Sequence, residues 1–158
     1  MKRSVPLIAI CIVLASTLGC YKESEQDKVK KIIINLQKAA EEKDIKKIVN
    51  SISETYNDPQ GNNYESIKGL VLAYFYQYPK ISMYIPSLDI SVEDASSKAT
   101  FQAVLTSRGA AESSPAVLPE SLGMYAFDVS LKKESGDWKV VSAKWERIAD
   151  VGKPATGK

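Results

Sequence analysis

Apolar residues recur every three or four positions through the first part of the chain beyond residue 26. This spacing predicts an amphipathic helix over about residues 27–43. Asp44 is of a residue type that favours a helix N-cap, and the apolar positions after it share one face as far as Tyr56. The pattern therefore predicts two consecutive helices, each with one buried face.

A third helix is expected over residues 63–78. Asn62 and Glu65 stand three positions apart, which is the spacing of a capping box at a helix start. Pro79 is expected to end this helix, because proline cannot continue the hydrogen-bond ladder.

The second half of the chain alternates apolar and polar residues with period two, which is typical of strands that bury one face. The sequence ESGD at 134–137 predicts a hairpin turn before a last strand. Residues 81–85 form a possible short extra strand in front of Pro86. The expected strands contain the alternating stretches 88–93, 100–105 and 125–131 and the last strand 138–148.

Helices first and strands afterwards indicate an α+β fold, with three N-terminal helices packed on a curved, mostly antiparallel sheet. Residues 27–149 are expected to form one domain, large enough to bury an independent core. The polar, glycine-containing stretch 150–158 is expected to be a flexible tail.

The first nineteen residues have the pattern of a signal peptide: Lys2 and Arg3, then a short apolar stretch, then Gly19 before Cys20. The ending TLGC resembles the lipobox of bacterial lipoproteins, although Thr17 stands where leucine is usual. The resemblance implies cleavage before Cys20, attachment of palmitate-type acyl chains to it, and a short tether over 20–26. An ordinary signal peptide that happens to contain a cysteine is the alternative.

Cysteine and charge counts change the picture in two ways. Cys11 would leave with the signal peptide and Cys20 would carry lipid, so no thiol would remain for a disulfide or a metal site. The 21 basic and 19 acidic residues become equal in number once Lys2 and Arg3 are removed. Nothing in this balance favours nucleic acid as a partner.

The location follows from the lipoprotein resemblance. In enteric lipoproteins an aspartate after the lipidated cysteine signals retention in the inner membrane, and Tyr21 stands there instead. The resemblance therefore implies a cell-envelope protein anchored in the outer membrane and facing the periplasm. Its partners would be the membrane itself, through Cys20, and a second copy or another envelope protein.

Three stretches resemble the nuclear transport factor 2-like superfamily and its SnoaL-like branch: AAEEKDIKKIVNSISETYND, YESIKGLVLAYF and FDVSLKKESGDWKVVSAKWER. The resemblance implies a cone-shaped barrel, related to cystatin-like folds, with a pocket between helices and sheet. Members include isomerases, cyclases, dehydratases and transport adaptors, so fold does not select an activity. Family members often dimerise through the open sheet face, and Val104, Met124 and Ala126 would permit that here.

The stretch YNDPQGNNYE at 56–65 offers carboxylate and amide oxygens around Gly61. An EF-hand calcium loop built on that glycine would need carboxylates where Tyr56 and Ile67 stand, so the spacing does not fit. A turn explains the stretch better, because proline and glycine set its backbone. A contact at the rim of a pocket remains open as well.

The predicted pocket offers few residues that could act as a general acid or base. The chain contains no histidine, the commonest general base near neutral pH. Strand parity directs Asp89, Glu93 and Asp128 away from the core, and Glu54 lies opposite the apolar face of its helix. Asp58 alone matches the acidic position that ends the second helix of SnoaL-like proteins. The candidate pocket residues are Tyr56, Asp58, Tyr74, Tyr78, Tyr84, Phe101, Tyr125 and Phe127.

No nucleophile elbow, phosphate loop, zinc pattern or dinucleotide motif is present, so no metal or cofactor is predicted. Residues 109–122 are long for a hairpin loop and could be a flap over the pocket, a docking segment at Val117 and Leu118, or a mobile loop. We expect a non-catalytic domain that binds a small apolar ligand or a protein partner. The alternatives are an isomerase or dehydratase that uses Asp58, and an accessory subunit of an envelope complex that would dock at Tyr76 or Val117.

Overall fold

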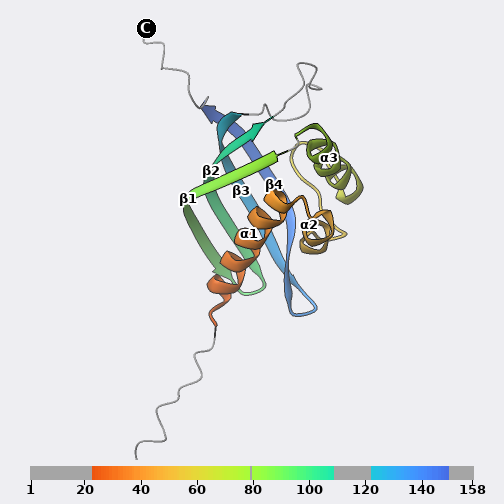
Figure 1. Cartoon of the computed structure of the whole chain (residues 1–158). Coiled ribbons are helices and arrows are strands. Elements are labelled where there is room, and N and C mark those ends of the chain that lie inside the picture. Colours follow the sequence, from red (N-terminus) through yellow and green to blue (C-terminus); the bar gives the residue numbers. More distant parts are fainter. Residues whose placement is uncertain (1–22, 79, 109–121, 150–158) are drawn as a thin grey trace, which may run out of the picture.

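Three helices precede four strands in a computed structural model of the chain, which describes residues 23–78, 80–108 and 122–149 (Figure 1). The expected α+β order is therefore confirmed. The helices are α1 (Glu25–Glu42), α2 (Ile45–Ser51) and α3 (Tyr64–Gln77). The strands are β1 (Lys80–Glu93), β2 (Ser96–Arg108), β3 (Leu122–Glu134) and β4 (Asp137–Ala149).

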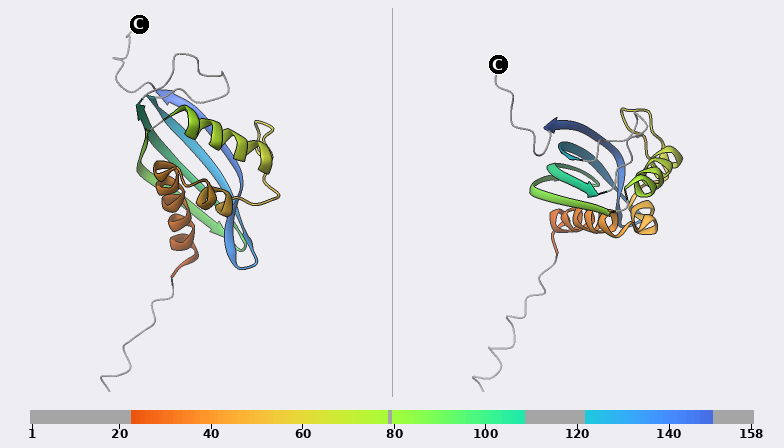
Figure 2. Two further views of the ribbon diagram at one scale, coloured as in Figure 1. Left: turned by 45° about the vertical axis from the view of Figure 1, so that its right-hand side comes forward. Right: turned by 45° about the horizontal axis from the view of Figure 1, so that its top comes forward.

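The four strands form one antiparallel sheet in the order β1-β2-β3-β4. The sheet curves around α1, which lies along its inner face, while α3 stands beside the β4 edge (Figure 2). Val29 and Ile33 of α1 are fully buried against the inner residues of the sheet, including Ala99, Leu131 and Val140. The core thus lies between α1 and the concave face.

The helix starts differ from the sequence expectation at two places. α1 begins at Glu25 because Ser24 and Asp27 form a capping box, so the helix takes over the last two positions expected in the tether. α3 begins at Tyr64 and is capped by Asn63 with Ser66, so the predicted box of Asn62 and Glu65 is wrong. Asp44 caps α2 as predicted, and its side chain accepts a hydrogen bond from the backbone of Lys47 at 3.1 Å.

The possible extra strand at 81–85 is the first part of β1 rather than a separate element. The register with β2 shifts between Tyr84 and Ser87, so β1 carries one extra residue there. This bulge contains Pro86, which an edge strand tolerates because its missing N–H faces outward. Consequently the inward-facing residues change from odd numbers before the bulge to even numbers after it.

Both edges of the sheet are partly covered by the chain itself. On β1, the backbone N–H of Met83 donates to Glu41 at 2.8 Å and its carbonyl accepts from Gln37 at 2.7 Å. On β4, the carbonyl of Val140 accepts from the backbone N–H of Ser53 at 2.9 Å. These contacts satisfy strand-edge groups that would otherwise be open to another chain.

Several predicted segments lie outside the described residues: the signal peptide at 1–19, Cys20, the tail at 150–158, and the loop at 109–122 except for Leu122, which begins β3. Within the described residues, no helix is both long and apolar enough to cross a membrane.

Candidate functional site: an apolar hollow between helices and sheet

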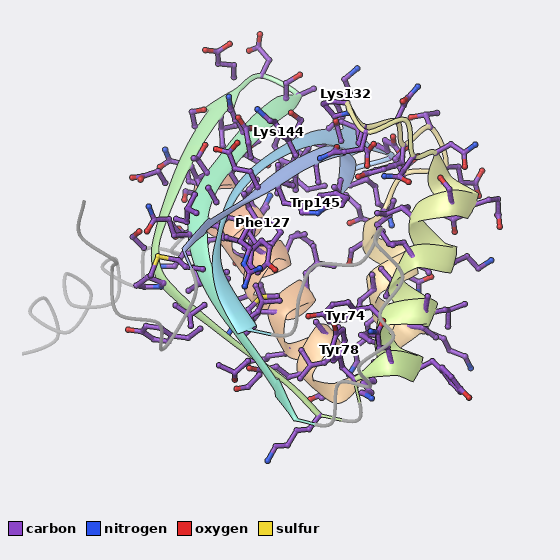
Figure 3. The ribbon with its side chains drawn as sticks, turned by 90° about the horizontal axis from the view of Figure 1, so that it is seen from above. Tyr74, Tyr78, Phe127, Lys132, Lys144 and Trp145 are labelled. Carbon is purple, nitrogen blue, oxygen red and sulfur yellow. The ribbon has the colours of Figure 1, made fainter. Side chains whose placement is uncertain are left out.

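The space between the helices and the concave face of the sheet contains two adjoining cavities, of about 210 Å³ and about 200 Å³. We call them the first lobe and the second lobe of one hollow. Both lobes are lined by Ile67 of α3, Met83 of β1, Phe127 of β3 and Trp145 of β4. These four side chains form the waist where the lobes meet, and Tyr74 of α3 and Tyr78 just after it lie across the hollow from Phe127 and Trp145 (Figure 3).

The walls of both lobes are almost wholly apolar. Among the described residues that line them, none is aspartate, glutamate, lysine or arginine. Besides the waist, the first lobe is lined by Ile33, Leu36, Gln37, Ile52, Tyr56, Ile85, Phe101, Val129, Val140 and Ala143. The second lobe is lined by Ala40, Ile48, Leu70, Val71, Tyr74, Phe75, Ile81, Leu105 and Tyr125.

An aromatic row crosses the sheet at the floor of the hollow. Phe101 and Phe127 are register partners on β2 and β3, and their rings stack with centroids 5.0 Å apart and planes at 11°. Trp145 is the register partner of Phe127 on β4, and the Tyr125 ring is tilted against that of Phe127 at 6.4 Å. Such cross-strand pairs stabilise the sheet and hold the aromatic rings in defined orientations.

Tyr74 of α3 lines the second lobe, and Tyr78, the residue after the helix, packs against it. The rings of Tyr74 and Tyr78 lie 4.5 Å apart at an angle of 52°. Burial raises the pKa of the Tyr74 hydroxyl, and the nearby Tyr78 and Tyr125 raise it further. Tyr74 is therefore a protonated hydrogen-bond donor at any physiological pH.

Asp58 does not line either lobe, although it is 5% exposed and close to Tyr56. Its carboxylate accepts hydrogen bonds from the Tyr56 hydroxyl at 2.9 Å and from the backbone N–H of Gln60 at 3.0 Å. Asn62 donates to it twice, from the backbone and from the side-chain amide, each at 2.9 Å. The structure thus supports the turn interpretation of residues 56–65 over a metal loop.

Tyr56 faces two ways in consequence. Its ring lines the first lobe, while its hydroxyl donates to Asp58 and accepts from the backbone of Ala143. Burial raises the pKa of the Tyr56 hydroxyl, and the hydrogen bond to Asp58 raises it further. A ligand in the first lobe would therefore meet an aromatic ring there, because the hydroxyl is already engaged.

Five of the eight predicted pocket residues line the hollow: Tyr56, Tyr74, Phe101, Tyr125 and Phe127. Tyr78 is 1% exposed and packs behind Tyr74 without lining a lobe. Tyr84 is 66% exposed. In this part of β1 the odd-numbered side chains face the core, so Tyr84 lies on the outer face of the sheet. That residue does not contribute to the hollow.

The acidic residues lie as strand parity predicted. Asp89, Glu93 and Glu54 are exposed, and Asp128 pairs with Lys98 at 2.7 Å on the outer face of the sheet. Among the described residues, no group of three or more histidine, cysteine, aspartate or glutamate side chains could hold a metal ion.

Trp145 is one of the lining residues that sequence reasoning missed. Trp138 and Val140 face inward on β4, and regular alternation would then turn Trp145 outward. The register with β3 shifts at Val141, which stands unpaired between the partners of Leu131 and Ser130. This bulge restores Ala143 and Trp145 to the inner face, and no local sequence signal announces it.

Proteins of known structure share this architecture at low sequence identity. A proposed dehydratase of the NTF2-like family from Streptomyces avermitilis aligns with a TM-score of 0.66 and 11% identity, over 78% of this chain and 96% of that one. A protein with a cystatin-like fold from Caulobacter vibrioides aligns with a TM-score of 0.66 and 10% identity, over 79% and 91%. No family model and no curated protein matches the sequence.

A protein from Bdellovibrio bacteriovorus aligns with a TM-score of 0.65 and 16% identity over 81% of this chain. The present chain spans only 44% of the length of that protein. At such identities the likeness shows the fold and no activity. The expected nuclear transport factor 2-like, cystatin-like fold is confirmed, with three helices packed on a four-stranded antiparallel sheet.

Proposed function

We propose that the domain binds a small apolar ligand in the hollow and catalyses no reaction on it. The observation that carries this proposal is the lining of the two lobes, which contains tyrosines and one glutamine but no charged side chain. Together the lobes fall within the range of about 300–1,000 Å³ that is typical of small-molecule sites. Apolar ligands gain free energy on leaving water for such a surface.

The polar groups in the first lobe are already committed to the protein. The Gln37 amide donates to the carbonyl of Met83 at 2.7 Å, and the Tyr56 hydroxyl is engaged with Asp58. A ligand that entered this lobe would lose its hydrogen bonds to water without replacement, so its buried part must be apolar.

An isomerase or dehydratase activity is the alternative, because two structural neighbours are proposed dehydratases. This alternative uses Asp58 as the base, but the Asp58 carboxylate accepts four hydrogen bonds within the turn and lines neither lobe. A general base must lie within hydrogen-bond distance of the proton that it removes. The geometry therefore favours binding over catalysis.

Binding is tested directly by a substitution that fills the first lobe with a larger side chain. Ala143→Phe adds a ring to its wall, whereas Ala126→Phe adds the same ring to the opposite face of the sheet. We expect a neutral apolar dye such as Nile red to bind the unchanged protein and the Ala126→Phe variant. Binding should weaken by at least about tenfold in Ala143→Phe. Equal binding by all three proteins would refute the proposal, provided that circular dichroism shows all three folded.

We propose as well that the protein is exported and anchored by lipid on Cys20, with the outer membrane as its site. The support is the sequence pattern of charged start, apolar stretch and terminal GC. Metabolic labelling with an alkyne palmitate analogue should mark the protein and leave a Cys20→Ser variant unlabelled. Equal labelling of both would contradict the anchor.

A protein partner is the second binding proposal, and two apolar regions of the surface support it. Tyr84, Val104 and Met124 form one row across three strands on the outer face, continued by Ala126 on the next row. On α3, Tyr76 is 94% exposed and Leu72 is 46% exposed. A Tyr84→Lys variant should shift a self-associating protein toward the monomer in sedimentation, while Tyr76→Lys should release an envelope partner that co-purifies.

A further inference from the structure

The hollow differs at its two ends in the hydrogen bonds that it can offer. In the first lobe the hydroxyl of Tyr56 and the amide of Gln37 already donate to protein acceptors. In the second lobe the hydroxyl of Tyr74 has no hydrogen-bond partner among the described residues. A bound molecule can therefore gain a hydrogen bond in the second lobe and only apolar contact in the first.

A second unsatisfied group lies next to Tyr74. Both side-chain amide atoms of Gln77 are buried without a partner among the described residues, one helical turn further along α3. Residues three apart on a helix are neighbours on its surface. Buried polar groups normally have partners. Gln77 itself lines neither lobe, so Tyr74 is the residue of this pair that meets a ligand in the second lobe.

Charge sets a further limit on the ligand. No cationic side chain lines either lobe among the described residues, so a carboxylate or phosphate inside the hollow would be buried without a counter-ion. Burying an unpaired charge costs far more free energy than burying a neutral polar group. The ligand must therefore be uncharged when bound.

The waist bears on the ligand's shape. The lobes are separate cavities that share Met83, an unbranched and flexible side chain, with Ile67, Phe127 and Trp145 around it. Methionine adapts its rotamer more readily than branched or aromatic residues do. A narrow flexible chain can pass a waist of this kind, whereas a rigid ring system would fit within one lobe.

We propose that the hollow takes an uncharged aliphatic molecule with one hydrogen-bonding group, that group held at Tyr74 and the chain passing Met83 into the first lobe. Long-chain alcohols, aldehydes and esters have this chemistry. The inference rests on the proposed binding function and adds the class of ligand and its orientation.

The test compares decanol, hexanol and decanoate as competitors of Nile red on the unchanged protein. Each methylene that is buried should strengthen binding by about fourfold, so decanol should bind much more tightly than hexanol. Decanoate should bind at least about tenfold more weakly than decanol at neutral pH and should recover as its carboxyl is protonated.

Two variants locate the ends of the ligand. Tyr74→Phe removes the donor. It should weaken the binding of decanol by about three- to tenfold and leave the affinity for decane unchanged. Thr100→Val removes a hydroxyl from an exposed position outside both lobes and should change neither. Ala143→Phe should lower the affinity for decanol to that for hexanol, because the first lobe no longer accepts the end of the chain.

The outcomes separate this inference from the proposed function. Failure of Nile red and of every chain to bind would overturn both. Normal dye binding with decanoate as strong as decanol, or with decanol unaffected by Tyr74→Phe, would overturn the ligand class and leave the binding function standing. The expected pattern of charge, length and Tyr74 dependence would support both.

Discussion

The hydroxyl of Tyr56 donates a hydrogen bond to the carboxylate of Asp58 at 2.9 Å, and both residues are buried. This contact joins the wall of the hollow to the turn behind it. It directs the one buried carboxylate of the described residues away from the ligand space and leaves an aromatic ring in its place. Asp58 is used to build the turn, so the lining of the hollow contains no carboxylate.

Replacing Asp58 by asparagine should therefore destabilise the fold and leave ligand binding intact. All four contacts to the carboxylate come from donors, and the amide of asparagine would turn a donor toward one of them. We expect a loss of about 1–3 kcal/mol in the free energy of unfolding, measured in urea. Nile red affinity should stay within about twofold. An unchanged stability together with lost binding would mean that Asp58 acts in the hollow.

Lys43 ends α1 with a left-handed backbone (φ 55°), and its ammonium group donates to the carbonyl of Phe75 near the end of α3 at 2.7 Å. Lys43→Ala should lose the contact and keep the backbone strain, whereas Lys43→Gly should lose the contact and remove the strain. Glycine is the residue best suited to this position. We expect the glycine variant to be more stable than the alanine variant by about 1 kcal/mol in urea unfolding. The reverse order would contradict the role assigned to the backbone.

Glu25 gives the fold a dependence on pH. Hydrogen bonds from Lys28, Lys133 and Trp138 lower the pKa of Glu25 from 4.5 to about 2. A carboxyl with a lowered folded pKa stabilises the protein above its unfolded pKa, and this stability is lost as the pH falls from about 4.5 toward 2. Urea unfolding should show that Glu25→Gln is less stable than the unchanged protein at neutral pH. The difference should shrink as the pH falls through that window, and a constant difference would contradict the assignment.

α3 should open more readily than α1 and the central strands. Ile67 is its one buried residue, although the helix is apolar over most of its surface. Elements with little buried surface open at low free-energy cost. Native-state hydrogen exchange should show α3 amides exchanging before those of β2 and β3, and decanol should slow them. Exchange of α3 and the central strands at one common rate would count against this order.

The helices were readable from the sequence because each has a local signal. The apolar spacing predicted both ends of α1 within two residues, and Asp44 predicted the start of α2, but α2 ends at Ser51, five residues before Tyr56. The start of α3 was displaced by one residue because Asn62 and Asn63 are both good caps. Only the fold shows that Asn62 is already bound to Asp58.

The hollow was readable only in part, because its lining depends on two bulges. Alternation places Phe101, Tyr125 and Phe127 correctly on β2 and β3, where the register is regular. On β1 and β4 an extra residue reverses the alternation, so Tyr84 faces out and Trp145 faces in. A bulge arises from strand pairing over long range, and a single sequence does not reveal it.

The central claim is that an uncharged apolar molecule occupies the hollow. Native mass spectrometry of the chain from Cys20 to Lys158, purified without detergent, tests it most directly. We predict a second population, heavier by one small neutral molecule, that disappears in Ala143→Phe and persists in Ala126→Phe. A single mass equal to that of the bare chain, unchanged after incubation with decanol, would contradict the claim.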